Sequence, residues 1–351
     1  MLSIYNKPYI IGETAFHHQG DKDFLLRLID EAANLGLPCI KFHLLLEIES
    51  YMAANHKAIN DLKKWIFHKE EWKEIIKTAH QKGLEVLALC NEPESAEFIM
   101  TEDLPVSGME LHATGLNDIF LLELAKQFNG TIVLGIGGST IDEINYAINY
   151  LNQNEQKDIL LMHGFQNYPT DPKEVNLLRG LKTAELFDLP VGYADHTDPN
   201  DDNNALISAT AFAMGFDVLE KHFTITHEPR IDSQAAVSIK TMKQIIDYSE
   251  TINLVTGSGK IEYSDSEKKY GDTGPMKKAI VAKKEIEKGE EITLENVWFK
   301  RTNESVYLKQ NALPSILGLK ANQNIPKDGI VDFSVIDYQF KAADFGQFKN
   351  E

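Results

Sequence analysis

The chain has 351 residues, of which 43% are hydrophobic and 25% charged, and its formal net charge is -18. This length exceeds the size at which a single hydrophobic core stops growing, so we expect one large domain and one small one. The negative charge disfavours nucleic acid and acidic membranes as partners, and no apolar run is long enough to cross a bilayer, so a small-molecule substrate is favoured.

The N-terminal segment and the two cysteines indicate a cytoplasmic protein. Residues 1–8 contain no apolar stretch followed by a small-residue cleavage site, so no secretion signal is predicted. Cys39 and Cys90 lie inside apolar runs that are typical of strands, where a thiol acts as a small hydrophobic group. We therefore expect no disulfide framework.

Up to about residue 255, short apolar segments alternate with amphipathic helical ones, which is the pattern of repeated βα units and a parallel sheet. Eight segments are predicted as strands, and this number favours a closed (β/α)8 TIM barrel. The predicted strands are residues 9–15, 38–45, 84–90, 108–113, 131–137, 158–164, 191–196 and 218–224.

Between these strands, apolar residues at three- and four-residue spacing predict helices over 21–35, 72–82, 140–151 and 204–214. Ser139 is predicted as the N-cap of the third helix. Residues 46–69 are longer than a typical βα loop and are predicted to form a lid or an extra helix.

The pattern changes near residue 260, where we expect the first domain, 1–260, to end. Residues 261–277 are polar and rich in turn formers, as in a linker. Residues 278–340 consist of short β-prone pieces separated by turns, which predicts a small β-rich domain. Residues 341–351 form a polar tail that is expected to fray.

Polar residues gather at the predicted strand ends, where a barrel of this kind holds its active site. Seven of the 11 histidines lie in or just after predicted strands. For a single histidine, a hydrogen bond that caps a strand end is the ordinary explanation. His196 and His222 differ, because they lie on the neighbouring strands seven and eight and their imidazoles would meet at one rim.

Two imidazoles with open coordination positions suit a catalytic divalent ion, and manganese, magnesium, cobalt and zinc all fit this ligand set. Asp195 and Glu220 precede the two histidines on the same strands. They are expected either to orient the rings or to form salt bridges between strand ends.

Several motifs in chain order carry a family resemblance. They are residues 13–21 (Glu-Thr-Ala-Phe-His-His-Gln-Gly-Asp), 39–43, 168–170, 192–197 and 219–224. These motifs resemble those of the sialic acid synthase (nonulosonic acid synthase) family. Residues 280–301 resemble its C-terminal antifreeze-like domain, a SAF domain of β-clip fold. The resemblance extends over nearly the whole chain.

The resemblance implies metal-assisted condensation of phosphoenolpyruvate with an N-acyl-mannosamine-type aldehyde sugar to give a nonulosonic acid. It implies that His196 and His222 hold the ion, for which manganese is preferred. It also implies that Glu13 manages a proton or orients the sugar and that Lys41 faces the donor's phosphate or carboxylate. The implied sugar contacts are Tyr168, Asp232 and Arg301, the last supplied by the partner subunit of a domain-swapped homodimer.

The chain departs from this family in the pocket for the donor's phosphate. At positions where the family carries hydroxyl donors or a lysine, this chain has Leu89, Glu110, Ala113, Gly135 and Ala194. Each lost charge-assisted hydrogen bond is worth roughly 1.5–3 kcal/mol, so weak binding of phosphoenolpyruvate is expected.

Three further positions, all expected to contact substrate, also differ from the family. Gln166 replaces an asparagine, His43 replaces a glutamine that touches the sugar, and His112 replaces a small residue. Either the alignment shifts by a residue or two in strands three to five, or the donor side has been exchanged, with His43, His112 and His163 supplying new polar groups.

Three functional hypotheses follow. The chain is a synthase of this family, or a divergent metal-dependent aldolase or lyase acting on another sugar acid, or a sugar-binding pseudoenzyme. Retention of Glu13, Lys41 and Tyr168 beside both metal histidines argues against the last, because a decaying site should lose these residues too.

Overall fold

The computed structural model describes residues 1–5, 8–165, 167–272 and 276–339. The chain divides into two compact units, Met1–Ser258 and Gly259–Glu351. Among the described residues, no helix has both the length and the hydropathy needed to cross a membrane.

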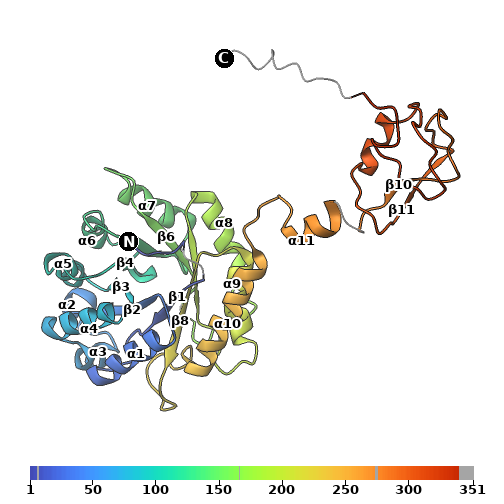
Figure 1. Cartoon of the computed structure of the whole chain (residues 1–351). Coiled ribbons are helices and arrows are strands. Elements are labelled where there is room, and N and C mark those ends of the chain that lie inside the picture. The colour runs from blue at the N-terminus through green and yellow to red at the C-terminus, as the bar shows by residue number, and fades with distance from the viewer. Residues whose placement is uncertain (6–7, 166, 273–275, 340–351) are drawn as a thin grey trace. The chain divides into compact units, whose positions relative to one another are not determined.

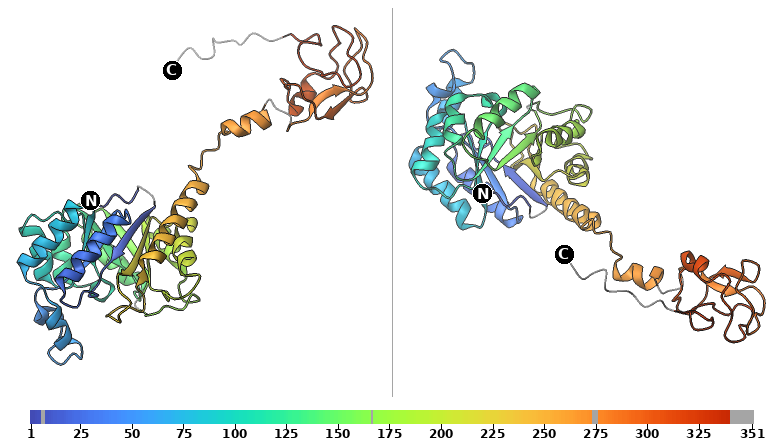
Figure 2. Two further views of the ribbon diagram at one scale, coloured as in Figure 1. Left: turned by 60° about the horizontal axis from the view of Figure 1, so that its bottom comes forward. Right: turned by 90° about the horizontal axis from the view of Figure 1, so that it is seen from above.

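The first unit is a closed barrel of eight parallel strands surrounded by helices (Figure 1, Figure 2). Each strand pairs with the next along the chain, and β1 pairs with β8 to close the sheet. The predicted TIM barrel is therefore confirmed. The strands are β1 (Tyr9–Glu13), β2 (Cys39–Leu44), β3 (Glu85–Cys90), β4 (Gly108–Leu111), β5 (Thr131–Gly135), β6 (Ile159–His163), β7 (Val191–Asp195) and β8 (Val218–Thr224).

Helices follow the strands around the barrel. Those that coincide with predicted segments are α1 (Lys22–Asn34), α4 (Lys69–Gln81), α7 (Ile141–Leu151) and α9 (Asn204–Met214). The long segment after β2 contains two short helices, α2 (Ile48–Tyr51) and α3 (Ile59–Trp65). The remaining barrel helices are α5 (Pro93–Thr101), α6 (Ile119–Ala125), α8 (Leu177–Phe187) and α10 (Ile239–Thr256).

The N-cap of α7 differs from the prediction. Thr140, not Ser139, caps this helix, because its side chain accepts a hydrogen bond from the amide of Glu143 while the Glu143 carboxylate accepts one from the amide of Thr140. This reciprocal capping box needs a Glu or Gln three positions after the cap, and Glu143 stands three positions after Thr140, whereas Ser139 has the shorter Asp142 there.

The interior of the barrel changes from apolar to ionic along the strands. Tyr9 and Ile11 on β1 and Cys39 on β2 belong to a buried apolar cluster. Side chains two residues apart on a strand face the same side. The next inward positions are therefore Glu13 and Lys41, which pair in register. The carboxyl ends of the strands thus carry charged groups into a buried space.

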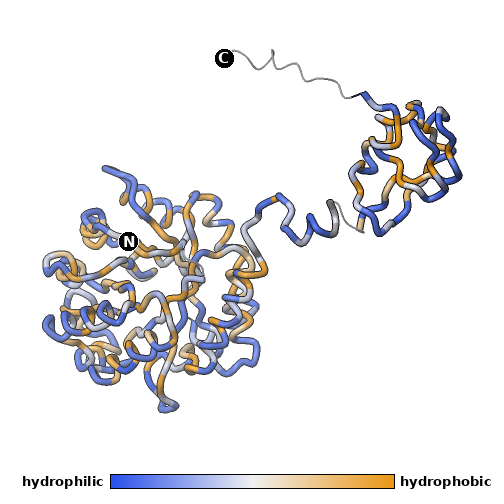
Figure 3. The backbone as a smooth tube through the Cα atoms, in the orientation of Figure 1, coloured by the Kyte–Doolittle hydropathy of each residue, from blue (hydrophilic) through white to orange (hydrophobic). Residues whose placement is uncertain are grey.

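The second unit contains the antiparallel pair β10 (Ala279–Ala282) and β11 (Val297–Lys300). Its own apolar cluster includes Ile280, Ile292 and Ile325. The short helical elements α11 (Asp265–Glu267) and η2 (Lys268–Asp272) lie within the predicted linker, and the chain is mostly hydrophilic over them (Figure 3). The predicted tail, 341–351, lies outside the described residues.

Candidate active site

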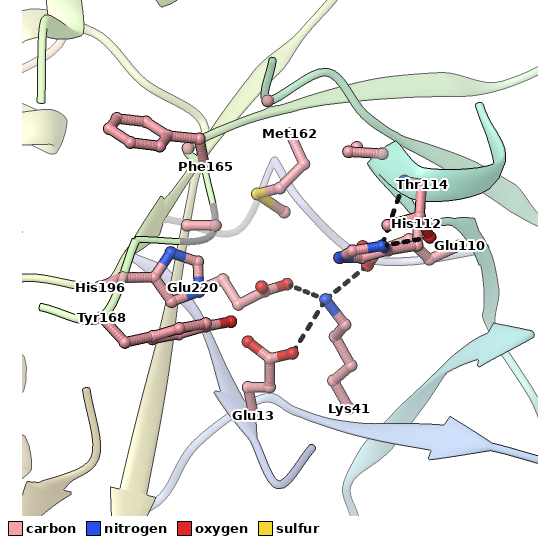
Figure 4. Close-up of a pocket in the computed structure, with 15 residues that line it drawn as sticks. Glu13, Lys41, Glu110, His112, Thr114, Met162, Phe165, Tyr168, His196 and Glu220 are labelled. Carbon is pink, nitrogen blue, oxygen red and sulfur yellow. Dashed lines mark hydrogen bonds and ion pairs between the residues drawn. The ribbon is translucent and has the colours of Figure 1, made fainter. Parts of the chain in front are cut away.

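A cavity of about 170 Å³ lies at the carboxyl ends of the barrel strands (Figure 4). Its acidic, lysine and histidine side chains come from five strands or the residues directly after them: Glu13, Lys41, Glu110, His112, His196 and Glu220. This is the end of the barrel at which TIM-barrel enzymes carry out their chemistry.

Glu13, His196 and His222 form a group that fits a metal ion. All three are buried, and one ligand atom from each lies within 4.8 Å of the others. Glu13 Oε2, His196 Nδ1 and His222 Nε2 are buried atoms without a hydrogen-bond partner among the described residues. Buried polar atoms are rarely left unpaired, so their convergence points to a cation between them.

The spacing within this group agrees with coordination of one ion. Glu13 Oε2 lies 3.1 Å from His222 Nε2. Two ligand atoms at about 2.1 Å from one ion lie about 3.0–3.4 Å apart at right or tetrahedral angles. Burial lowers the pKa of His196 to about 4 and that of His222 to about 3, so both rings are neutral at pH 7, the form that binds metal.

The carboxylate of Glu13 is held in place by residues of β2. His43 Nε2 donates a hydrogen bond of 2.7 Å to Glu13 Oε1, and Lys41 Nζ lies 3.3 Å from the same oxygen. Burial opposes ionisation of Glu13, but His222, Lys41 and His43 outweigh it and lower the pKa of this carboxyl well below its usual value. One oxygen is thus occupied by β2, and the other faces the two histidines.

Lys41 stands at the centre of a buried ionic cluster (Figure 4). Its ammonium nitrogen lies 2.8 Å from a carboxylate oxygen of Glu110, 2.9 Å from Glu220 and 3.3 Å from Glu13. Burial alone would lower the pKa of Lys41, but these carboxylates raise it well above its usual value. Burial also raises the pKa of Glu110 and of Glu220.

Asp195 and Glu220, which precede His196 and His222, form salt bridges, and within the described part of the chain no hydrogen bond joins them to the two imidazoles. Glu220 pairs with Lys41, and Asp195 pairs with Lys221 at 2.9 Å. Asp195 also accepts hydrogen bonds from the amide and hydroxyl of Thr197 and from the hydroxyl of Ser208. Of the two expectations for Asp195 and Glu220, the structure favours salt bridges.

Tyr168 and Asp232 lie close to the metal group. The ring of Tyr168 packs edge-on against His196, with centroids 4.9 Å apart. Asp232 is half-buried in a left-handed backbone conformation, with φ of 63°. Burial raises the pKa of its carboxyl to about 6, and the nearby charge of Glu13 adds to this shift.

His112 and His163 have different surroundings. His112 lines the cavity, and its Nδ1 accepts hydrogen bonds from the hydroxyl and amide of Thr114. His163 does not line it. Met162 and Gly164 face the cavity, so the alternation of β6 directs His163 outward, where its Nε2 donates to the carbonyl of Val175. The expectation that His163 supplies a polar group to the donor side is wrong.

The positions that depart from the resembled family concentrate in this cavity. Glu110, Ala113, Gly135 and Ala194 all line it, whereas Leu89 lies beside it, paired in register with Glu110. The lining near Gly135 is formed by backbone in close approach, because a Cβ at Gly137 would lie 1.8 Å from the carbonyl oxygen of Gly164.

Three of the predicted site residues remain: Gln166, Arg301 and Glu13. Gln166 lies outside the described residues. Arg301 belongs to the second unit, which the structure describes separately. Glu13, expected to act on a proton or the sugar, also supplies the third atom of the metal group, and its signal in the sequence was its place at the end of a strand adjacent to β8.

Comparisons with known proteins agree with this architecture. A sequence model of the NeuB family matches residues 28–261, and one of the SAF domain matches residues 277–334. The N,N'-diacetyllegionaminic acid synthase of Campylobacter jejuni is 27% identical over 93% of this chain and 99% of that protein. The pseudaminic acid synthase of Campylobacter jejuni is 25% identical over 91% of this chain and 94% of that protein.

A solved structure provides a further comparison. The N-acetylneuraminic acid (sialic acid) synthetase of Leptospira borgpetersenii, in complex with citrate, superposes with a TM-score of 0.68 at 26% identity. The match covers 74% of this chain and 89% of that one.

Proposed function

The chain belongs to the NeuB family and is a carbon–carbon bond-forming synthase of that type, and from this we infer that it joins a three-carbon donor to the aldehyde carbon of an N-acyl-mannosamine-type sugar. The product is a nonulosonic acid. The observation that carries the proposal is the convergence of three buried ligand atoms without hydrogen-bond partners, from Glu13, His196 and His222, beside the cavity that Glu13 and His196 line.

The metal group supports this chemistry. A divalent ion held by Glu13, His196 and His222, with manganese preferred over magnesium, cobalt and zinc, would polarise the aldehyde oxygen of the sugar. Tyr168 packs beside His196 and limits the room for the sugar. Asp232 offers a carboxyl group to a sugar hydroxyl.

Two residues of β2, Lys41 and His43, position the carboxylate of Glu13. His43 and Lys41 both engage Glu13 Oε1, which leaves Oε2 directed toward His222. Such outer contacts commonly tune ligand orientation in metal sites.

The proposal extends to the assembly and location of the protein. We expect a domain-swapped homodimer in the cytoplasm, in which Arg301 from the partner's SAF domain reaches the N-acyl group of the sugar. This expectation rests on the family resemblance.

The decisive experiment measures product by mass spectrometry. The manganese-loaded protein is incubated with N-acyl-mannosamine-type sugars and three-carbon donors, beside His196→Ala, His222→Ala and the control His80→Ala, whose histidine is exposed on α4. We expect product from the wild type and the control, and at least a hundredfold less from the two site variants. If wild type forms no product with any pair while it still binds manganese, the pseudoenzyme hypothesis replaces the proposal.

A further inference from the structure

The donor side of the cavity carries an unusual balance of charge. Among the described residues that line it, Lys41 is the only lysine or arginine, and it faces three buried carboxylates: Glu13, Glu110 and Glu220. With all three ionised, the cluster holds an excess of two negative charges.

Carboxylates already surround the ammonium group of Lys41. Three of them lie 2.8–3.3 Å from its nitrogen, and the Glu220 carboxylate accepts a hydrogen bond from it. The carboxylates arrive from different strands, Glu13 from β1, Glu110 from β4 and Glu220 from β8, so they surround it (Figure 4). An incoming phosphate oxygen would have to displace one of them and leave a buried carboxylate unpaired, which is strongly unfavourable.

The rest of the described lining offers few groups to a phosphate. Ala113, Gly135 and Ala194 have no side-chain donor. Burial lowers the pKa of His112 to about 3, so this ring carries no charge at pH 7. In the glycine-rich turn after β5, the amides of Ile136 and Ser139 already donate to the carbonyls of Met162 and Ile136. The Gly137 amide and the Tyr168 hydroxyl also belong to the lining, but neither group carries a charge that could balance a phosphate.

We propose that the donor is a three-carbon 2-oxo acid of the pyruvate class, which carries a single negative charge, and not a phosphorylated acid. The proposal rests on the proposed function. A divalent ion on the metal group would bring the cluster of Lys41 and three carboxylates to neutrality. The single carboxylate of a 2-oxo acid adds only one negative charge to it. A phosphate ester brings about two further negative charges, which nothing described in the lining compensates.

The reaction that follows is an aldol addition in which all atoms are retained. A lining carboxylate takes a proton from the methyl group of the 2-oxo acid. The electron pair left on that carbon forms the new bond to the aldehyde carbon of the sugar, and the aldehyde oxygen takes up the proton. No water is consumed and no phosphate leaves, so the product mass equals the sum of the two reactants.

Calorimetric titration of the manganese-loaded, full-length protein tests the charge argument. The ligands are pyruvate, phosphoenolpyruvate and inorganic phosphate. We expect pyruvate to bind at least tenfold more tightly than phosphoenolpyruvate. In Glu110→Gln, affinity for phosphoenolpyruvate should rise at least tenfold while that for pyruvate changes less than threefold. The control Glu97→Gln, at an exposed position on α5, should match wild type.

Two results separate the donor proposal from the proposed function. Tighter binding of phosphoenolpyruvate than of pyruvate by wild type, or phosphate release during product formation, overturns the donor proposal and leaves the synthase function standing. Tighter binding of pyruvate without product from any sugar supports the donor proposal and counts against the synthase function.

Discussion

At the scale of single residues, the site depends on the orientation of the Glu13 carboxylate. Its two oxygens have separate tasks, since one accepts from His43 and the other faces His222. His43 was expected to touch the sugar, whereas the geometry also makes it a positioning residue for a metal ligand.

Replacing His43 distinguishes these two roles. In His43→Ala, Glu13 loses its short hydrogen bond, and we expect manganese affinity to fall about 10- to 100-fold, as for other residues that orient metal ligands. Calorimetry with manganese alone measures this change. An unchanged manganese affinity together with a raised KM for the sugar would restrict His43 to sugar contact.

Lys41 is predicted to stabilise the fold as well as the site. Lys41→Met leaves Glu13, Glu110 and Glu220 buried without their cation, and breaking a buried ion pair in this way costs about 3–5 kcal/mol. Urea denaturation measures the free energy of unfolding. The double variant Lys41→Met/Glu110→Gln should recover part of the loss, and a single variant within about 1 kcal/mol of wild type would contradict this account.

The sequence was sufficient to place some of these residues and not others. His196 and His222 could be paired because they end neighbouring strands. The cluster on Lys41 could not be predicted in full, because Glu110 and Glu220 come from strands far from β2 in the chain and their contact with Lys41 depends on the closed barrel. His163 was misplaced because a strand-end histidine faces inward or outward according to the alternation of the strand.

At the scale of elements, the junction between β3 and α5 holds a titratable group. Glu92 is buried, 1% exposed, and accepts hydrogen bonds from the amides of Leu46 and Glu47. Burial raises its pKa from 4.5 to about 7, although the amide bonds oppose this shift. The native state therefore keeps a proton that the unfolded chain releases.

This shift predicts how stability changes with pH. Below about pH 4.5 both states hold the proton and Glu92 contributes no pH dependence. Between about pH 4.5 and 7 its contribution falls, by at most about 3 kcal/mol, and it is constant above pH 7. Glu92→Gln should remove this decrease, so urea denaturation should show the variant more stable than wild type at pH 8. Equal pH dependence in the two proteins would contradict the assignment.

Element prediction succeeded where the apolar pattern was distinct. The eight strands appear as apolar runs, and α4 and α7 show clear helical spacing. The helix α6 is nearly all apolar over Ile119–Ala125, so it has no polar face from which a period could be read. The cap of α7 was misplaced by one residue because two adjacent hydroxyl residues both satisfy the usual composition of an N-cap.

At the scale of the whole molecule, the metal group and cavity belong entirely to the first unit, while Arg301 belongs to the second. A test of Arg301 therefore needs two measurements: one of sugar binding, which Arg301 is expected to affect, and one of metal binding, which depends on the first unit alone. Arg301→Ala should raise the KM for the N-acyl sugar at least tenfold and leave manganese affinity unchanged. Steady-state kinetics and calorimetry on the same preparation measure both, with Lys327→Ala as a control at an exposed position of the same unit. An unchanged KM would remove Arg301 from the site.

The central claim is that carbon–carbon bond formation depends on an ion held by Glu13, His196 and His222. The most direct measurement follows product formation as manganese is returned to chelator-treated protein. We predict no product without metal, a rate that reaches its plateau at one ion per chain, and no response in His196→Ala. Product formed at the same rate in excess chelator would contradict the claim.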